Sequence, residues 1–344
     1  CAFVVAECRH VREHVGLLDM SAFAKCSVTG PNAESWLNGL VANIVPKTVG
    51  RIGLCHMLSK NGGVRSEFTI YKRSQNNYYL VFAGAQERHD WDYLKKLAPS
   101  DGSVIMQKLT TQIGVLVLAG PKSREVLQKL TDTDLGNDNF KWLSGKRIDI
   151  GYAQAEALRV NFIGELGWEL HHPIEMQNYI FDALMAAGAE HQVRPFGIRA
   201  MESMRLEKSY RLIPRELSIE YSALESGLDR FIKLDKEQDF IGKQALISWQ
   251  RRGFKYRFVT LEVHGTKDAD ARGSEGLYEK SRLVGRATSG GYGFRTSKSL
   301  ALGLVEAELA VIGTDLEIEI LGERYPATVI EESPYDPDNE RLRA

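Results

Sequence analysis

Cysteine is scarce in this sequence of 344 residues, and an excess of charge of one sign and long apolar runs are both missing. Four cysteines, all in the first sixth of the chain, are too few for a disulfide scaffold. No uncharged apolar run approaches the roughly 20 residues that span a bilayer, so we expect no membrane segment. The 44 basic residues are balanced by 45 acidic ones, which argues against a nucleic-acid partner.

Nucleotide-binding motifs are also absent. The sequence contains neither a G-x-G-x-x-G that opens a helix after a strand nor a G-x-x-x-x-G-K-[ST], which disfavours a Rossmann dehydrogenase. The glycine cluster Gly285, Gly290, Gly291 and Gly293 is predicted to serve turns between strands. No secretory signal is recognisable, so we expect a cytoplasmic protein, or one of the mitochondrial matrix if the source is eukaryotic.

Two short arrangements resemble metal or nucleophile sites. His10 and His14 are four residues apart on a predicted helix, with Cys8 nearby, but the H-E-x-x-H pattern is absent. Their charged neighbours indicate a solvated helix face, and we expect no metal site. The neighbours Cys55 and His56 should point to opposite faces of a strand, so we expect Cys55 to pack in the core.

An internal repeat is the clearest organising feature of the chain. Residues 24–40 and 114–130 each read as a β-rich run, a Gly-Pro pair and an amphipathic helix. The glycine permits a tight turn, and the proline suits the first helical position, where its missing N–H costs nothing. Residues 51–71 and 148–172, which follow the two units, both read as hairpins with glycine-containing turns. We therefore predict two related halves.

Other elements follow from hydrophobic periodicity. Helices are predicted over residues 11–18, 85–97, 176–187 and 197–210. From residue 258 the pattern changes to short strands, which predicts a small antiparallel barrel or sandwich. These strands are predicted over residues 258–263, 301–304, 316–321 and 327–330. The chain is thus predicted to be an α+β protein with one domain over residues 1–246 and a β domain over residues 247–344.

Two carboxylates stand at matching places in the two halves. Glu67 and Glu169 each lie in an apolar strand, and the two-residue period of a strand puts Glu67, Thr69 and Tyr71 on one face. A glutamate in such a strand is costly to bury unless it is paired or serves chemistry. If the halves pack around a pseudo-twofold, both glutamates could face a common cavity, bind a nitrogen-rich ring and move a proton. The alternative is that both lie on edge strands and point to water.

The predicted helix over residues 197–210 carries Arg199 and Arg205 among apolar positions. An arginine that faced a pocket would suit a ligand with a carboxylate tail. The alternative is a salt bridge on the helix surface, either Arg199 with Glu202 or Glu202 with Arg205.

Taken together, these segments resemble the aminomethyltransferase (glycine-cleavage T-protein) superfamily, nearest to the tetrahydrofolate-binding half of dimethylglycine and sarcosine dehydrogenases. The resemblance covers essentially the whole chain in order. The residues that carry it are 11–12, 16–21, 30–31, 62–69, 120–121, 164–170, 199–208, 240–243 and 285–292.

The resemblance implies a fold of three lobes in a ring around a folate cavity, with two interleaved α/β lobes and one antiparallel β barrel. It implies that Glu67 is the essential carboxylate beside the reacting folate nitrogens and that Glu169 holds the pterin. The family often has Asp at the first position, and T-proteins have a second Asp just before it, where this chain has Ser66. It further implies that Arg199 binds the ligand. Pocket-lining residues are, on the same basis, Thr69, Leu170 and His171, and we include Tyr71 because it shares the strand face of Glu67 and Thr69.

The implied activity is transfer of a one-carbon unit to tetrahydrofolate from an N-methyl amine of the dimethylglycine or sarcosine type, giving 5,10-methylenetetrahydrofolate. Three alternatives stay open: a folate-dependent demethylase that yields 5-methyltetrahydrofolate, a glycine-cleavage aminomethyltransferase, and a folate-binding scaffold without catalysis. The start at Cys1 suits a piece of a longer polypeptide with a preceding flavin-dependent module. We expect FAD only with such a module.

Overall fold

The computed structural model describes residues 2–266 and 269–344 and divides the chain into two compact units. The first unit holds the described residues up to His56 together with Ser66–Ala200 and Asn339–Ala344. The second holds Met57–Arg65 and the described residues of Met201–Asp338. Each of these units is built from separate segments of the chain, whereas the predicted domains divide it once, between residues 246 and 247. That division stays a prediction. Cys1 lies outside the described residues.

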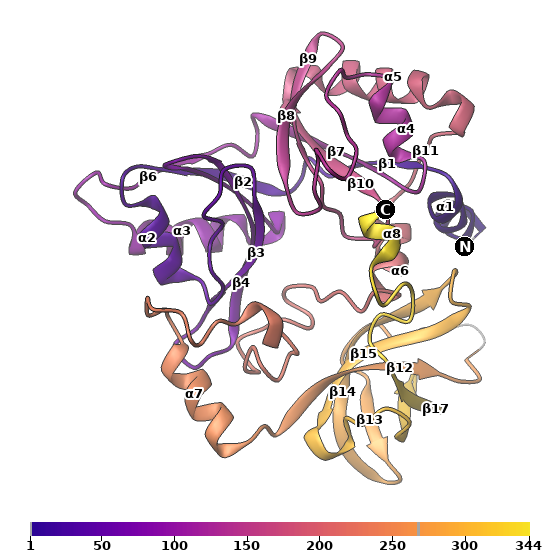
Figure 1. Ribbon diagram of the computed structural model, residues 1–344. Helices are drawn as coiled ribbons and strands as arrows, with labels where there is room; N and C mark the ends of the chain where they lie inside the picture. The colour runs from indigo at the N-terminus through magenta and orange to yellow at the C-terminus, as the bar shows by residue number, and fades with distance from the viewer. Residues whose placement is uncertain (1, 267–268) are drawn as a thin grey trace. The chain divides into compact units, whose positions relative to one another are not determined.

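A six-stranded sheet with the order β11-β1-β7-β10-β9-β8 belongs to the first unit. Its strands are β1 (Gly16–Asp19), β7 (Ile113–Ala119), β8 (Gly145–Ile150), β9 (Ala153–Leu158), β10 (Gly167–Pro173) and β11 (Arg194–Pro195). Only β1 and β11 pair in parallel; the other neighbours are antiparallel. The helices α4 (Ser123–Gln128) and α5 (Gln177–Ala187) lie against this sheet (Figure 1). Trp168, Leu170 and Ile180 are buried in the core that forms there.

A second sheet, most of which belongs to the first unit, has five strands in the order β3-β4-β5-β2-β6. Its strands are β2 (Ala24–Thr29), β3 (Ile52–Leu58), β4 (Val64–Ser74), β5 (Asn77–Phe82) and β6 (Ile105–Lys108). The helices α2 (Ala33–Leu40) and α3 (Glu87–Leu97) lie beside it (Figure 1). Tyr71 and Tyr79 of this sheet share a buried cluster with Leu158 of β9, so the two sheets pack against each other. Both predicted hairpins are confirmed, as β3–β4 and β9–β10.

The two Gly-Pro units predicted from the repeat are present at the ends of β2 and β7. Gly30 has a φ of +121° and Gly120 has a φ of +130°, a conformation that side chains rarely tolerate. The sequence predicts that each helix starts at the proline. In the structure the helices start two residues later, at Ala33 and Ser123. The N–H groups of Ala33 and Ser123 donate to the carbonyls of Gly30 and Gly120 at 3.1 and 3.0 Å. Each proline thus occupies the second position of a β-turn, which its fixed φ suits.

Gly120→Ala should destabilise the protein. A Cβ at this position would lie 2.5 Å from the carbonyl oxygen of His14 and 2.8 Å from that of Val11, and these backbone atoms cannot move aside. Together with the positive φ, we expect a loss of about 1–2 kcal/mol in the free energy of unfolding. Urea unfolding measures it, with Gly197→Ala as control because a Cβ there meets only an ordinary contact at 3.6 Å. Equal stability of the two variants would contradict the prediction.

Two of the predicted helices differ from the structure. The prediction over residues 11–18 is wrong in its second half, because α1 spans Ala2–Glu13 and β1 begins at Gly16. Leu17 lies opposite Leu118 of β7, and its carbonyl accepts the N–H of Phe196, so pairing with distant segments decides the local conformation. The helix predicted over residues 197–210 is present as α6 (Ile198–Leu206) and ends early. The predictions at α3 and α5 are confirmed within two residues at each end.

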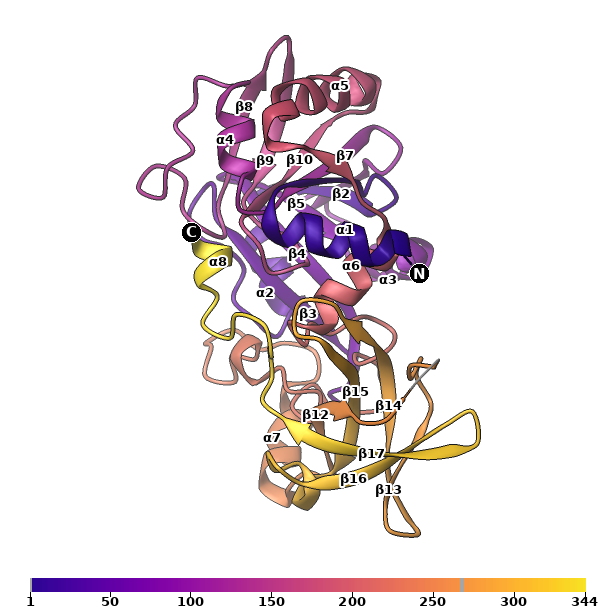
Figure 2. The same ribbon diagram turned by 90° about the vertical axis from the view of Figure 1, so that its right-hand side faces the viewer.

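The second unit contains a closed six-stranded antiparallel barrel, as the resemblance implied, with the order β12-β15-β14-β13-β16-β17 (Figure 2). Its strands are β12 (Tyr256–Val263), β13 (Gly276–Glu279), β14 (Arg282–Gly293), β15 (Lys298–Glu306), β16 (Asp315–Ile320) and β17 (Glu323–Ile330). The barrel is filled by apolar side chains that include Leu261, Leu277 and Ile318.

The glycine cluster in this unit does not serve turns, which corrects the prediction. All four glycines lie within β14, and two of them, Gly285 and Gly290, permit close approach of neighbouring backbone. A Cβ at Gly285 would lie 2.2 Å from the carbonyl oxygen of Leu304, and one at Gly290 would lie 2.7 Å from that of Ala271. Gly285 and Gly290 therefore serve close packing in the barrel.

Short elements complete the described chain. They are α7 (Lys243–Arg252), α8 (Glu340–Arg343) and 3-10 helices at Gly84–Gln86, Ile174–Met176, Ala189–His191, Asp229–Phe231 and Ala307–Leu309. Of the helices in residues 2–266 and 269–344, none is both long enough and apolar enough to cross a membrane.

Candidate functional site

The first candidate carboxylate, Glu67, lies on β4 in the interior of the five-stranded sheet. Because β3 and β5 flank this strand, the alternative of an edge-strand glutamate is wrong. Burial alternates along β4: Ser66 and Phe68 are buried, whereas Glu67 and Thr69 are partly exposed. Tyr71, the next residue on that face, is buried. The predicted shared face is therefore confirmed, and it is open to a ligand near Glu67 and Thr69.

Glu67 is held by a buried histidine. Nε2 of His56, on β3, lies 2.8 Å from Oε2 of Glu67. The imidazole is fully buried, while 23% of the Glu67 side chain is exposed. An ionised carboxylate only accepts hydrogen bonds, so Nε2 carries the hydrogen and donates it. Oε1 of Glu67 makes no hydrogen bond with residues 2–266 and 269–344 and remains available to a ligand.

Sequence reasoning missed His56 as a site residue. It considered His56 only beside Cys55, whose side chain is buried as predicted. The available signal was the hairpin: β3 and β4 pair across a short turn, so a histidine before the turn can meet a glutamate after it.

The second candidate carboxylate, Glu169, lies on β10 between β7 and β9, again away from a sheet edge. Its Oε2 lies 3.1 Å from Nε2 of His171, and Nδ1 of His171 lies 3.0 Å from the hydroxyl of Tyr79. Burial raises the pKa of Tyr79 well above its usual value, so the phenol keeps its proton and donates to Nδ1. His171 then donates from Nε2 to Glu169. A chain of two hydrogen bonds orients this carboxylate.

The hydrogen bond between Tyr79 and His171 also joins the two sheets of the first unit. The guanidinium carbon of Arg73, on β4, lies 3.8 Å from the ring centroid of Tyr79. Nε of Arg73 donates to Oε2 of Glu156, on β9, at 2.9 Å. Sequence reasoning missed Tyr79, Arg73 and Glu156, because in the sequence they are ordinary strand residues whose partners lie far along the chain.

The strand register relates the two carboxylates. Tyr79 lies opposite Tyr71, four residues from Glu67 on β4. Four residues of strand span about 13 Å, so the Glu169 network contacts the same sheet at roughly that distance along the strand from Glu67. The structure thus brings Glu169 and His171 to the sheet that carries Glu67 and Thr69. A common cavity for both carboxylates stays a prediction.

Two further predicted site residues, Leu170 and Arg199, differ from the others in how their side chains are placed. The side chain of Leu170 is in the core of the six-stranded sheet, on the opposite face from Glu169, so only its backbone could meet a ligand beside Glu169. Arg199 is exposed in the first turn of α6, and its guanidinium has no hydrogen bond or ion pair among the residues that the structure describes. Of the two salt bridges that the sequence offered as the alternative, the one between Glu202 and Arg205 is present.

Tyr71→Phe should reduce the decrease in the free energy of unfolding that the protein shows above pH 10. Burial raises the pKa of Tyr71 to about 12, from an ordinary value of 10.0, and the Glu156 carboxylate adds to the rise. Its contribution to stability is complete below pH 10 and is lost as the pH rises toward 12, because only the unfolded chain ionises in that window. Urea unfolding on either side of pH 10 tests this. Tyr152→Phe, at an exposed tyrosine, is the control; identical pH profiles for the two variants would contradict the prediction.

Within residues 2–266 and 269–344, no three His, Cys, Asp or Glu side chains gather closely enough to hold a metal ion. The rings of His10 and His14 stack at 5.0 Å between centroids.

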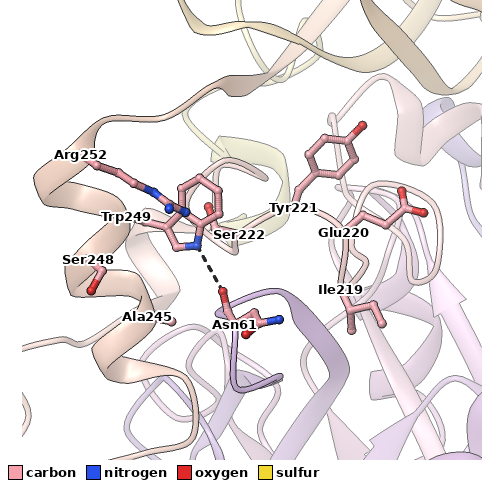
Figure 3. Close-up of a pocket in the computed structure, with 9 residues that line it drawn as sticks. All are labelled: Asn61, Ile219, Glu220, Tyr221, Ser222, Ala245, Ser248, Trp249 and Arg252. Carbon is pink, nitrogen blue, oxygen red and sulfur yellow. Dashed lines mark hydrogen bonds between the residues drawn. The ribbon is translucent and has the colours of Figure 1, made fainter.

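A surface pocket of about 440 Å³ lies within the second unit (Figure 3). The indole of Trp249 donates to the carbonyl of Asn61 at 3.2 Å and stacks with the guanidinium of Arg252 at 3.6 Å. The other lining residues are Ile219, Glu220, Tyr221, Ser222, Ala245 and Ser248. The lining includes none of the residues that the sequence predicts for the site.

Comparison with known families identifies the class of protein. Residues 1–236 match the GCVT N-terminal domain, and residues 257–336 match the glycine cleavage T-protein C-terminal barrel domain. The chain therefore belongs to the glycine-cleavage T-protein family of folate-dependent aminomethyltransferases, whose members bind tetrahydrofolate.

Individual relatives refine this assignment. The chain is 40% identical to mitochondrial dimethylglycine dehydrogenase of Mus musculus over 96% of its own length, but spans only 38% of that protein. It is 30% identical to an aminomethyltransferase of Listeria welshimeri, with 97% of the chain and 90% of the relative covered. The crystal structure of the glycine-cleavage aminomethyltransferase T of Bartonella henselae shares the fold, with a TM-score of 0.86, 22% identity and coverage of 97% of this chain and 90% of that one.

Proposed function

We propose that the chain transfers a methylene unit from an N-methyl amine of the dimethylglycine or sarcosine type to tetrahydrofolate, giving 5,10-methylenetetrahydrofolate. The observation that carries the proposal is Glu67: a partly exposed carboxylate in an interior strand, with one oxygen engaged by His56 and the other available. Membership of the folate-dependent family and 40% identity to a dimethylglycine dehydrogenase support it.

Glu169 is proposed to bind the pterin ring. Its side chain is 15% exposed and its Oε2 accepts from His171, so the carboxylate is oriented before a ligand arrives. Acceptor oxygens suit the amino and ring N–H groups of a pterin, which are donors. Thr69, Tyr71, His171 and the backbone of Leu170 are proposed to line the same site, and Arg199 is proposed to bind the carboxylate tail.

Glu67 is proposed to be the catalytic proton acceptor. Tetrahydrofolate supplies two secondary amine nitrogens that take up the carbon. When an iminium donor gives its methylene, two N–H protons must leave: one passes to the released amine nitrogen and the other to a base. The available Oε1 of Glu67 can accept that proton, and its negative charge stabilises the cationic donor. No electron is transferred in this step.

The source of the methylene is proposed to lie outside this chain. The mouse relative is named a dehydrogenase and the chain matches only 38% of it, so amine oxidation is assigned by this proposal to the remaining part of such a protein. FAD binding is proposed only for that part. Glycine cleavage is the second candidate, favoured by the Listeria aminomethyltransferase, which the chain matches along 90% of its length. That activity would require an aminomethyl group on a lipoyl carrier protein.

Product analysis tests the proposal. The chain is mixed with tetrahydrofolate and the adduct of formaldehyde with sarcosine, and formation of 5,10-methylenetetrahydrofolate is compared with the uncatalysed rate. We expect a rate well above background with this donor and none with a lipoyl-bound aminomethyl group. Acceleration only with the lipoyl donor would favour glycine cleavage, and 5-methyltetrahydrofolate as product would favour a demethylase. Folate binding without turnover of any donor would favour a scaffold.

A further inference from the structure

His56 contacts the proposed catalytic carboxylate from the buried side. We propose that His56 is a positioning residue that fixes Glu67 in a single orientation and reserves Oε1 for the reacting nitrogen. This inference rests on the proposed function of Glu67. It concerns a residue that the sequence pattern marks only as the neighbour of Cys55 and that the resemblance does not single out.

The two side chains differ sharply in exposure. The His56 side chain is fully buried, whereas 23% of the Glu67 side chain is exposed. A ligand can therefore reach Glu67 but not His56. The backbone under His56 is also held, because its carbonyl accepts the N–H of Ala42 at 2.9 Å and its strand is paired with β4. The imidazole is thus a fixed donor behind a carboxylate that faces outward.

The two carboxylate oxygens of Glu67 have different roles in this proposal. At 2.8 Å the Nε2–H of His56 occupies Oε2 in a charge-assisted hydrogen bond. Oε1 then takes up the proton in the transfer step, while the bond to Oε2 persists. The His56–Glu67 pair needs no other group to balance this step, since the proton passes from the attacking nitrogen to Oε1.

Side-chain length makes the pairing specific to glutamate. An aspartate on the same backbone would be one methylene shorter and would withdraw its oxygens by about 1.5 Å. The present 2.8 Å separation from Nε2 would then exceed the roughly 3.5 Å limit of a hydrogen bond. Glu67→Asp therefore keeps the charge but removes the contact with His56, which separates the two contributions experimentally.

Steady-state kinetics of the full chain with tetrahydrofolate and the formaldehyde–sarcosine adduct test the proposal. For His56→Leu we expect kcat to fall on the order of 10- to 100-fold with the KM for tetrahydrofolate nearly unchanged, because the base is misplaced and the pterin contacts are intact. His56→Gln, whose amide can donate in place of Nε2, should restore most of kcat. His191→Gln is the control: His191 lies on the 3-10 helix Ala189–His191, its Nε2 is 3.2 Å from Oε1 of Glu190, and it is not among the proposed site residues.

A double-mutant cycle asks whether the two residues act as a unit. We expect His56→Leu in the Glu67→Asp background to lower kcat by less than about threefold more, because the contact is already lost. Wild-type kcat in His56→Leu, or effects that multiply in the double variant, would overturn the proposal.

Nitrogen NMR of labelled histidine gives a readout that needs no activity. The His56 signal, identified among the eight histidines by its loss in His56→Gln, should show the Nε2–H tautomer and should change in Glu67→Asp. A Nδ1–H tautomer, or a signal indifferent to Glu67→Asp, would refute the proposal. A wild-type chain that makes no product above the uncatalysed rate would refute the proposed function instead, and this spectrum would still decide the arrangement of His56.

Discussion

Glu67→Gln should lower kcat for methylene transfer by roughly 10²- to 10⁴-fold, the range that a positioned general base contributes. The amide has the shape of the carboxylate, and its carbonyl oxygen can still accept the hydrogen of His56, so the local packing is kept. What it cannot do is accept the proton that leaves the attacking nitrogen or stabilise a cationic donor. The dissociation constant for tetrahydrofolate should therefore change little, because the residues proposed to bind the pterin are unchanged.

The measurement combines product formation with calorimetric titration of tetrahydrofolate. Glu262→Gln is a matched control, since Glu262 is also a strand glutamate, in the barrel of the second unit, and is 24% exposed against 23% for Glu67. It should retain wild-type kcat. Turnover by Glu67→Gln at the wild-type rate would remove Glu67 from catalysis.

Glu169→Gln should weaken tetrahydrofolate binding by about 1.5–3 kcal/mol, which is roughly 10- to 150-fold in the dissociation constant. The carboxylate of Glu169 is oriented by His171 and accepts from ring N–H groups of the pterin in the proposed complex. The variant replaces one acceptor oxygen with an NH₂ group, which would face those donors with another donor. At saturating tetrahydrofolate, kcat should fall much less than in Glu67→Gln.

Calorimetry on both glutamate variants separates the two carboxylates. We expect Glu169→Gln to change mainly the dissociation constant for tetrahydrofolate and Glu67→Gln to change mainly kcat. Wild-type affinity in Glu169→Gln, with the fold intact by circular dichroism, would show that the pterin is held elsewhere. The Glu262→Gln variant again serves as the reference.

Much of the fold follows from local patterns. The β-turn-α repeat, the two hairpins, the helices α3 and α5 and a β-rich C-terminal region are all predictable, because turns and amphipathic periodicity are encoded within short windows. The positive φ of Gly30 and Gly120 explains why glycine stands at both turns. These elements include the strands that carry Glu67 and Glu169, so the approximate place of both carboxylates is also predictable.

The failures share one physical cause. Leu17 and Leu18 fit the apolar pattern of a helix as well as that of a strand. Only pairing with β7 selects the strand β1. The glycines of β14 are typical of turns between strands, and only the close approach of Leu304 and Ala271 explains why Gly285 and Gly290 stand within a strand. In each case a distant segment supplies the deciding contact, and a local window does not contain it.

The candidate site shows the same division at the level of side chains. Strand periodicity is sufficient to place Glu67 and Thr69 on one face and to mark a glutamate in an apolar strand as exceptional. The hydrogen bonds that orient the carboxylates are formed across strands: His56 reaches Glu67 from the neighbouring strand, and Tyr79 meets His171 from 92 residues away. Hydrogen bonding depends on distances of a few tenths of an ångström. Such distances arise only when the sheets are assembled, and so the partners of both glutamates became known from the folded chain.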